Sequence, residues 1–149
     1  MALEQHFEYD CGVAAVRYLF AMRGWQLHDY ERDMQYARTT PEHGTSHEGI
    51  INLMRAYGFK GVDRHEPIYE VPLFSVVNYQ NFKTGDPLGD YGHYGVLVGM
   101  DAGDEKGTPK NVYIWSPSEG TVDTFDTFAF MNRFYSKQFK PGYWSASLD

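Results

Sequence analysis

The chain has 149 residues, of which 42 % are hydrophobic and 17 % aromatic, and this length and composition suit a single folded domain over residues 1–149. Its formal net charge of −7 argues against nucleic acid as a partner, because phosphate binding needs a basic face. No apolar run approaches the roughly 18 residues of a membrane span, and one cysteine excludes an internal disulfide and suits a reducing compartment, so we expect a cytoplasmic protein.

The first half of the sequence predicts helices. The segment 12–24 carries aliphatic and aromatic residues at the i, i+3, i+4 spacing of a buried helix face, and ends in a glycine. A second, more polar helix is predicted over 29–36. A third is predicted within 44–59, with Thr45 or Ser46 as its N-cap.

After residue 60 the pattern changes to short β-branched and aromatic runs, which predict strands over 73–80, 93–101 and 111–117. Turn-rich loops are predicted between these strands, over 85–92 and 101–110. A further strand or turn over 120–126 leads into a short helix over 127–135. Helices first and strands afterwards is the α+β pattern. We therefore predict an α+β fold, with N-terminal helices packed on an antiparallel β-sheet.

Cys11 stands at the start of the first predicted helix. The N-terminus of a helix favours an anion, because its free N–H groups and its dipole point there, so the position suits a nucleophilic thiolate. Gln5 lies six residues upstream and can direct its side-chain amide to the same point, which with the Cys11 N–H makes a two-donor oxyanion hole. A buried structural cysteine is the alternative interpretation. Asp10 is expected to cap the helix.

His93 begins the predicted strand GHYGVLVGMD, where a side chain can be held rigidly toward a cleft. A neutral imidazole beside a thiol accepts its proton and later returns it to the leaving group. A histidine that only forms structural hydrogen bonds is the alternative. The remaining histidines lie on polar stretches and are predicted to be at the surface: His6, His28, His43, His47 and His65.

A third feature, IWSPSEG at the end of the strand predicted over 111–117, makes a resemblance specific. The chain resembles the C39-like cysteine peptidases, a branch of the papain-like superfamily. The matching elements follow in order: Gln5 with Asp10-Cys11-Gly12, Gly44-Thr45-Ser46 before a helix ending in Tyr57-Gly58, VVNYQNF, Gly92-His93-Tyr94 with VLVGMD, and SPSEG ahead of a phenylalanine-rich helix. The likeness runs from about Gln5 to Tyr135, most of the chain.

The resemblance implies a papain-like peptidase fold, with a cleft between the helical part and the sheet. It also implies that Cys11 is the nucleophile, His93 the general base and Gln5 the oxyanion-hole donor. The departure is at the third position, where the family usually has Asp-Pro-x-x-Gly and this chain has Ser116 at the start of SPSEG. A serine hydroxyl can accept a hydrogen bond from the imidazole and fix its tautomer, but it has no charge to stabilise an imidazolium.

Three interpretations of this departure stay open. Ser116 alone can suffice as the partner of the histidine. Asp101, Asn78 or Glu119 can reach the ring instead, from a neighbouring strand or turn. Or the triad is degenerate, and the domain binds without cutting.

The predicted function is that of a cysteine peptidase, which hydrolyses a peptide or amide bond through a Cys-His thiolate nucleophile and a thioester intermediate. The alternative is a catalytically impaired, peptidase-like domain that binds peptides or a protein partner. No metal or organic cofactor is expected, since His43 and His47 share an i, i+4 spacing but flank Gly44 in a loop. The expected partner is a peptide or protein substrate, with no nucleic acid or membrane, and the sequence predicts no particular oligomeric state.

Three further groups of residues have structural expectations. The stretch Asn78-Tyr79-Gln80 is expected to pack the sheet and shape the cleft. The aromatic residues near the C-terminus are expected to pack in the core: Tyr135, Tyr143 and Trp144. The loop over 101–111 either borders the cleft or is a solvated insertion.

Overall fold

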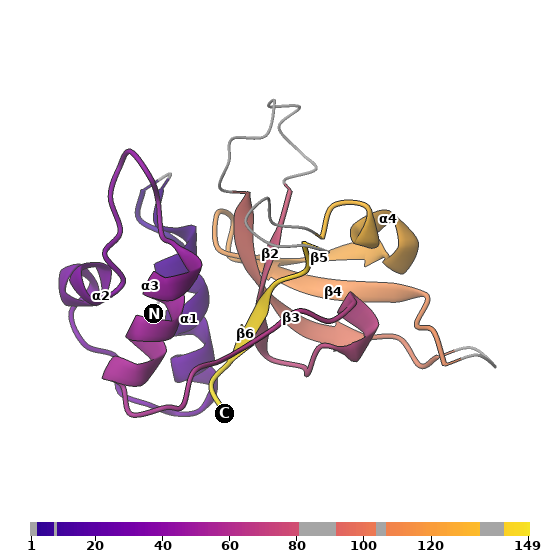
Figure 1. Cartoon of the computed structure of the whole chain (residues 1–149), viewed down its shortest axis with the longest axis horizontal. Coiled ribbons are helices and arrows are strands. Elements are labelled where there is room, and N and C mark those ends of the chain that lie inside the picture. The colour runs from indigo at the N-terminus through magenta and orange to yellow at the C-terminus, as the bar shows by residue number, and fades with distance from the viewer. Residues whose placement is uncertain (1–2, 8, 81–91, 104–106, 135–141) are drawn as a thin grey trace.

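The computed structural model describes residues 3–7, 9–80, 92–103, 107–134 and 142–149. Figure 1 shows helices α1 to α3 beside a twisted sheet. The helices are α1 (Cys11–Met22), α2 (Tyr30–Tyr36), α3 (His47–Ala56), the 3-10 helix η1 (Ile68–Glu70) and α4 (Thr127–Met131). The strands are β1 (Val62–Arg64), β2 (Ser75–Tyr79), β3 (His93–Met100), β4 (Asn111–Ser116), β5 (Thr121–Asp126) and β6 (Ser145–Ser147). The predicted α+β fold is confirmed.

The described strands form one antiparallel sheet in the order β1-β6-β2-β3-β4-β5. Strands β2 to β5 follow one another as neighbours, whereas β6 comes from the C-terminal end of the chain and lies between β1 and β2 (Figure 1). The helical part packs on the sheet chiefly through α1 against β3. This contact decides the geometry of the candidate site, since Cys11 begins α1 and His93 begins β3.

Helix α1 follows the predicted segment 12–24 closely. It begins at Cys11 and ends at Met22, and Gly24 follows with a φ of 73°, in the left-handed region that favours glycine. The apolar residues that gave the helical spacing are buried: Val13, Val16, Leu19 and Phe20. The periodicity therefore identified the face that packs against the sheet.

Helix α3 has Ser46 as its N-cap, one of the two predicted candidates. The Ser46 hydroxyl accepts a hydrogen bond from the Gly49 N–H at 3.0 Å. The hydroxyl of Thr45 instead lies 2.7 Å from the hydroxyl of Thr39. Thr45 thus joins two segments of the helical part rather than the end of α3.

A buried ion pair holds the three N-terminal helices together. The guanidinium of Arg17 in α1 donates to the carboxylate of Asp33 in α2 at 2.5 Å, and the hydroxyl of Tyr57, which follows α3, donates to the same oxygen at 2.7 Å. Breaking a buried pair of this kind costs about 3–5 kcal/mol, because it leaves a charge without its partner. The network makes the helical part a firm support for Cys11.

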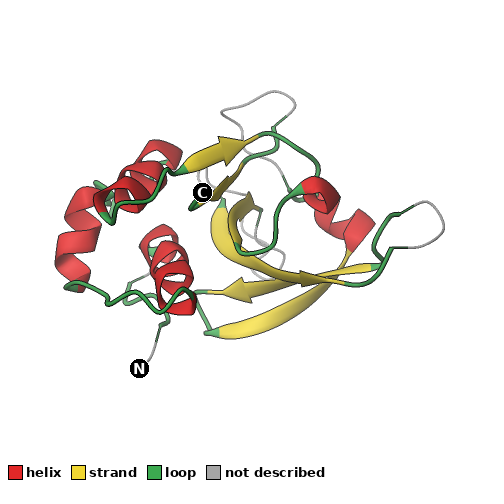
Figure 2. Ribbon diagram, turned by 90° about the horizontal axis from the view of Figure 1, so that it is seen from below, coloured by secondary structure: helices red, strands yellow, loops and turns green. Residues whose placement is uncertain are grey.

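The sheet carries a core on each face, because side chains alternate along a strand. The face toward α1 and α3 includes Val96 and Trp115, and the opposite face, toward η1 and α4, includes Leu97 and Ile114. Figure 2 shows the helical part and α4 on different sides of the strands. Ser116 and His93 share the alternation of Ile114 and Leu97, so both belong to the face away from the N-terminal helices.

Several sequence predictions are changed by the structure. Strands β1 and β6 were not predicted, the segment 120–126 is a strand, and the helix predicted over 127–135 ends at Met131. The loop over 101–110 follows the end of β3 that lies farthest from His93, about 23 Å along the strand, so its described residues do not border His93. Tyr135 and nearly all of the predicted loop 85–92 lie outside the described residues. Within the described ranges, no helix combines the length and the apolar character needed to cross a membrane.

Candidate active site

Gly12 explains how Cys11 can lie close to the sheet. A Cβ at this position would come within 2.8 Å of Ile50 Cδ1, 2.9 Å of Thr45 Cβ and 3.1 Å of the Tyr94 ring. Only glycine lets the first turn of α1 approach α3 and β3 this closely. Glycine after Cys11 is therefore required by packing, and it lets Cys11 lie close to β3, the strand that carries His93.

The thiol of Cys11 is shielded from water and lies beside backbone N–H groups. The residue is half-buried, and burial of its sulfur raises the pKa to about 11, with the neighbouring charge of Asp10 acting in the same direction. Backbone N–H groups of Tyr94, Gly12 and Cys11 itself act in the opposite direction, because they stabilise the thiolate. Burial outweighs these donors, so the helix N-terminus alone does not ionise the thiol at neutral pH.

His93 is fixed by its backbone and by an aromatic neighbour. Gly92 precedes it with a φ of 61°, and a Cβ there would lie 3.1 Å from the Tyr79 carbonyl oxygen. His93 pairs with Tyr79 across β2 and β3, and the Tyr79 ring meets the imidazole edge-on at a centroid distance of 5.4 Å. Gly92 of the Gly-His-Tyr motif thus allows the backbone to turn into β3 at a place with too little room for a larger side chain.

Ser116 is placed where the third member of the triad was expected. Its hydroxyl oxygen lies 3.4 Å from Nε2 of His93, a long hydrogen bond, and 3.0 Å from the hydroxyl of Ser118. If Nε2–H donates to Ser116, the Ser116 hydroxyl is free to donate to Ser118, and Nδ1 is the nitrogen that can accept a proton. The geometry therefore agrees with a tautomer suited to a general base.

Gln5 belongs to an N-terminal segment that is tied to the same turn as Ser116. Its backbone N–H donates to the carbonyl of Pro117 at 2.9 Å. Its side-chain nitrogen donates to the carbonyl of Phe7 at 2.5 Å, which leaves a second N–H on the amide. The structure thus joins Gln5 to the Ser116 turn, and its side chain is anchored to its own loop.

We predicted that the side chain of Asp10 would cap α1, and this prediction is wrong. Asp10 occupies the N-cap position without a side-chain cap bond, and its carboxylate accepts the N–H groups of His6 and Phe7, both at 3.0 Å. The acid is fully buried and shapes the loop between Gln5 and Cys11. Sequence reasoning missed this role. The signal for it was the spacing, since Asp10 follows Phe7 by three residues and His6 by four.

The other candidates for the third position have different partners. Asp101 lies after the far end of β3 and accepts hydrogen bonds from the side chains of Asn111 and Tyr113, which lowers the pKa of its carboxyl. Asn78 donates at 3.4 Å to the backbone carbonyl of His93. The Ser116 hydroxyl does contact the imidazole.

His47 was predicted to be at the surface, and this prediction is wrong. It begins α3 but is 7 % exposed, stacks on Trp144 at a centroid distance of 4.1 Å, and its Nδ1 lies 2.7 Å from the hydroxyl of Tyr94. Burial lowers the pKa of His47 to about 4. Its partner Trp144 packs in the core, as expected for that residue. The other histidines predicted at the surface are exposed: His6, His28, His43 and His65.

No model of a known protein family matches the sequence, and no curated protein is significantly similar to it. Among solved structures, the peptidase domain of Streptococcus ComA, a bi-functional ABC transporter of a quorum-sensing pathway, superposes with a TM-score of 0.74 over 97 % of this chain and 93 % of that one, at 15 % identity. A double-glycine-motif protease from an AMS/PCAT transporter, solved with its leader peptide, gives 0.70 over 96 % and 86 %, at 17 % identity. The peptidase C39-like domain of a Vibrio parahaemolyticus toxin secretion protein gives 0.63 over 92 % and 94 %, at 8 % identity.

The chain has the C39 peptidase fold. This confirms the architecture that the resemblance implied, and it extends over nearly the full length of both chains. At these identities the likeness establishes the fold, while the roles of Cys11, His93, Ser116 and Gln5 depend on the chemistry of this chain's own site. Among the described residues, no group of three or more histidines, cysteines or acids is arranged to hold a metal ion.

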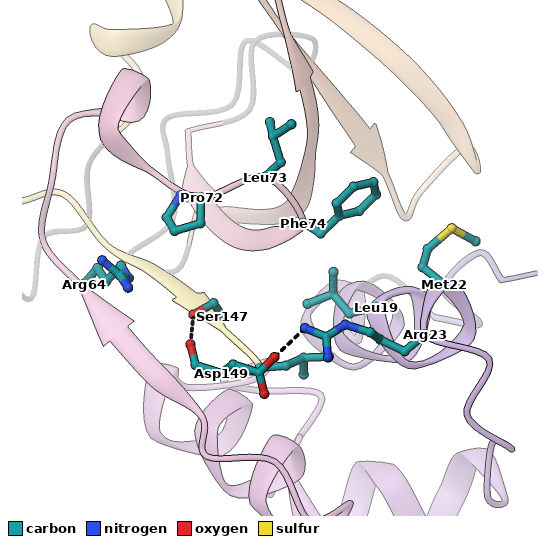
Figure 3. Close-up of a pocket in the computed structure, with 10 residues that line it drawn as sticks. Leu19, Met22, Arg23, Arg64, Pro72, Leu73, Phe74, Ser147 and Asp149 are labelled. Carbon is teal, nitrogen blue, oxygen red and sulfur yellow. Dashed lines mark hydrogen bonds and ion pairs between the residues drawn. The ribbon is translucent and has the colours of Figure 1, made fainter.

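Two cavities of this C39 peptidase fold lie at opposite ends of α1. One, of about 640 Å³, is lined by the loop before Cys11 and by α2. The other, of about 530 Å³, lies where α1 ends, near the start of β2 and the end of β6. Figure 3 shows the second cavity, with the Arg23 guanidinium bound to Asp149 at 2.6 Å and the Ser147 hydroxyl bound to the Asp149 carbonyl. Because α1 is about 18 Å long, the second cavity is remote from Cys11.

Proposed function

We propose that this chain is a cysteine peptidase that hydrolyses a peptide bond, with Cys11 as nucleophile and His93 as general base. The observation that carries the proposal is a convergence on β3. The Tyr94 N–H supports the Cys11 sulfur, and the preceding residue, His93, presents Nε2 to the Ser116 hydroxyl. The thiol and the orienting hydroxyl thus contact neighbouring residues at the start of β3, Tyr94 and His93, which supports a role in acyl transfer.

The raised pKa of Cys11 supports a transfer of the thiol proton as the first step. At neutral pH the thiol is protonated, so its proton passes to Nδ1 of His93 as the sulfur attacks the carbonyl carbon. The carbonyl π electrons move to oxygen and give a tetrahedral oxyanion. His93 then donates the same proton to the nitrogen of the leaving amine, the C–N bond breaks, and a thioester remains on Cys11.

Hydrolysis of the thioester repeats the sequence with water. His93 removes a proton from water, the hydroxyl oxygen adds to the thioester carbonyl, and the C–S bond breaks. The proton returns to sulfur, and the acid product leaves. The same intermediate can also pass to an amine, which would form a new amide bond instead.

Two donors serve the oxyanion in this mechanism. The first is the backbone N–H of Cys11, one of the N–H groups at the start of α1 that have no intrahelical acceptor. The second is the N–H of the Gln5 amide that is not used in its bond to Phe7. Each donor of this kind contributes roughly 3–4 kcal/mol to transition-state stabilisation in acyl transfer.

Ser116 is proposed to orient the imidazole without supplying charge. Its hydroxyl fixes the tautomer, and the Tyr79 edge restricts the ring on another side. Cysteine chemistry tolerates this weaker partner, because a thiol gives up its proton more readily than a serine hydroxyl does. A lower rate than that of a carboxylate-assisted site is the expected consequence.

The proposed substrate is a peptide with small residues at the scissile bond. The protease of the AMS/PCAT transporter that shares this fold is described as acting at a double-glycine motif and was solved with a leader peptide. We therefore propose fluorogenic peptides that contain Gly-Gly as the first substrates to test.

The test compares the wild-type chain with Cys11→Ala, His93→Ala, Ser116→Ala and Ser116→Asp. The first two variants should lose at least about 10³-fold in kcat/KM, Ser116→Ala about 10-fold, and Ser116→Asp should match or exceed the wild type. Mass spectrometry of a quenched reaction should detect the acyl adduct on Cys11. Cleavage that persists in Cys11→Ala would exclude the proposed nucleophile.

The alternative function, peptide binding without cleavage, makes a different prediction in the same experiment. Wild type and Cys11→Ala would then bind Gly-Gly peptides equally, with no product and no adduct. Fluorescence anisotropy of a labelled peptide separates these outcomes from a protein that does not recognise peptides.

A further inference from the structure

The cavity beside the N-terminal segment, of which residues 5–7 and 9–10 are described, has two walls. One wall is this segment itself, which contributes the side chains of His6, Phe7 and Tyr9. The other wall is α2 with the residues on either side of it, and the side chains that matter here are Asp29, Tyr30, Glu31, Met34 and Arg38. The His6 ring stacks on the Tyr30 ring at a centroid distance of 3.7 Å, which joins the walls at one side.

Its position relates the cavity directly to the proposed chemistry. The loop that forms its first wall begins at the proposed oxyanion donor, Gln5, and ends at Cys11. Asp10 fixes the shape of that loop through the N–H groups of His6 and Phe7. Because the cavity shares this loop with Cys11, we assign it to the side chain of a substrate residue a few positions from the scissile bond.

The lining combines aromatic rings with negative charge. Phe7 is 51 % exposed, and its ring stacks parallel to Tyr9 at 5.2 Å, which gives a flat aromatic surface at the cavity. Within the part of the chain that the structure describes, the carboxylates of Asp29 and Glu31 form no ion pair or side-chain hydrogen bond. Arg38 is the one cation among the described lining residues, so the lining has a net negative charge.

We propose that this cavity binds the side chain of a lysine or arginine in the peptide substrate, close to the scissile bond. An aromatic face attracts a cation through its quadrupole, and carboxylates in the same cavity lining add a direct charge interaction. The long aliphatic stem of either residue can lie along Phe7 and Met34 while its charged end reaches the acids. This inference rests on the proposed peptidase function.

The test is a matched set of peptides with Lys, Gln or Glu at each of the three positions on either side of a Gly-Gly bond. We expect one position at which kcat/KM falls in the order Lys, Gln, Glu, with Lys about 10-fold above Gln. In Asp29→Asn/Glu31→Gln this preference should fall to within about 2-fold. In Arg38→Gln it should rise, because the competing positive charge is removed.

The control variant is Glu70→Gln, which removes an exposed carboxylate from η1, outside the cavity. It should leave the Lys preference unchanged and thereby separate a local effect from the overall charge of the protein. A Lys preference that is equal in the wild type and in Asp29→Asn/Glu31→Gln would overturn the proposal, as would a preference for Glu.

Binding of the same peptides to Cys11→Ala distinguishes failure of this inference from failure of the proposed function. Cleavage without any charge preference would leave the peptidase and remove the cavity assignment. Absence of cleavage, together with Lys-selective binding that Asp29→Asn/Glu31→Gln abolishes, would support the cavity assignment and reject the peptidase. Absence of both cleavage and charge-selective binding would reject the two together.

Discussion

At the N-terminal end of helix α1, a Cβ on Gly12 would come within 2.8 Å of Ile50, whereas at the C-terminal end a Cβ on Gly24 would meet no atom within 4 Å. The first end is tightly packed on the side of α3 and β3 and holds the buried carboxylate of Asp10, while the cavity beside it lies on the side of α2. The second end opens on the cavity of Figure 3. Large apolar side chains are about half-exposed around it: Met22, Leu73 and Phe74.

The difference shows what the close packing achieves. At the crowded end, the same contacts that fix Cys11 against β3 also remove water from its thiol, which raises its pKa to about 11. The packing that fixes the position of Cys11 thus also makes its thiol less acidic. His93 is therefore needed to accept the thiol proton, because the helix N-terminus alone does not ionise the thiol. At the open end no chemistry depends on position, and substitutions there should have small effects.

The largest expected effect concerns the reactivity of Cys11. In His93→Ala no imidazole accepts the thiol proton, so alkylation by iodoacetamide should be slow at pH 7 and increase with pH toward the raised pKa of Cys11, about 11. In the wild type, proton transfer to His93 should make the reaction at pH 7 at least about 100-fold faster. Intact mass measured against time from pH 6 to pH 10 gives both profiles. Superimposable profiles would show that His93 does not act on the thiol.

The second prediction concerns His47, which contacts Tyr94 at the crowded end. Its pKa is about 4 in the folded chain and ordinarily 6.5, so between these values the unfolded chain binds a proton that the folded chain does not. Stability should therefore fall as pH decreases from 6.5 to 4, by about 3 kcal/mol from this group. The charges of His65 and Asp63 also act on His47, in opposite directions.

Urea denaturation from pH 4.5 to pH 7.5 measures this loss. His47→Gln should be less stable than the wild type at pH 7.5 and should lose less stability on acidification. His28→Gln, at an exposed histidine, should keep the wild-type slope. Equal slopes in His47→Gln and the wild type would mean that His47 is not held neutral by burial.

The sequence predicted the elements whose signals are local. The helical spacing identified the buried face of α1, and alternating β-branched residues identified β2, β3 and β4. The short strands β1 and β6 have three residues each and pair with one another, although more than 80 positions separate them in the sequence. No local pattern identifies such a pair, because its register depends on where β2 brings β6.

The candidate site was predictable to a similar extent. Cys11, His93 and Ser116 were identified by motif; the Ser116 hydroxyl lies 3.4 Å from Nε2 of His93, and the catalytic roles of the three residues stay a prediction. Burial was not predictable in the same way. His47 lies in a polar stretch, and the ring that covers it, Trp144, is 97 residues away. The raised pKa of Cys11 has the same origin, since it depends on the packing of three elements around Gly12.

The third prediction compares the two glycines directly. Gly12→Ala should destabilise the protein by about 1–3 kcal/mol through overpacking, and it should lower kcat by displacing Cys11 from β3. Gly24→Ala should cost about 1 kcal/mol, because alanine disfavours a φ of 73°, and it should leave kcat unchanged. Thermal unfolding and peptide cleavage measure both quantities. A loss of activity in Gly24→Ala equal to that in Gly12→Ala would remove the distinction between the two ends.

The fourth prediction compares two acids, one buried and one exposed. The N–H groups of His6 and Phe7 donate to different oxygens of Asp10. Asp10→Asn keeps an oxygen for one of these N–H groups and places an NH2 group opposite the other, so it should lower stability by about 1–2 kcal/mol. It should also lower kcat, because the loop that it shapes carries Gln5. Asp149→Asn breaks an exposed pair with Arg23 and should change stability by less than about 0.5 kcal/mol. Chemical denaturation in 0.05 M and 0.5 M NaCl separates the two, since only the exposed pair is screened by salt. If Asp10→Asn were as mild as Asp149→Asn, the loop before Cys11 would not depend on the buried carboxylate.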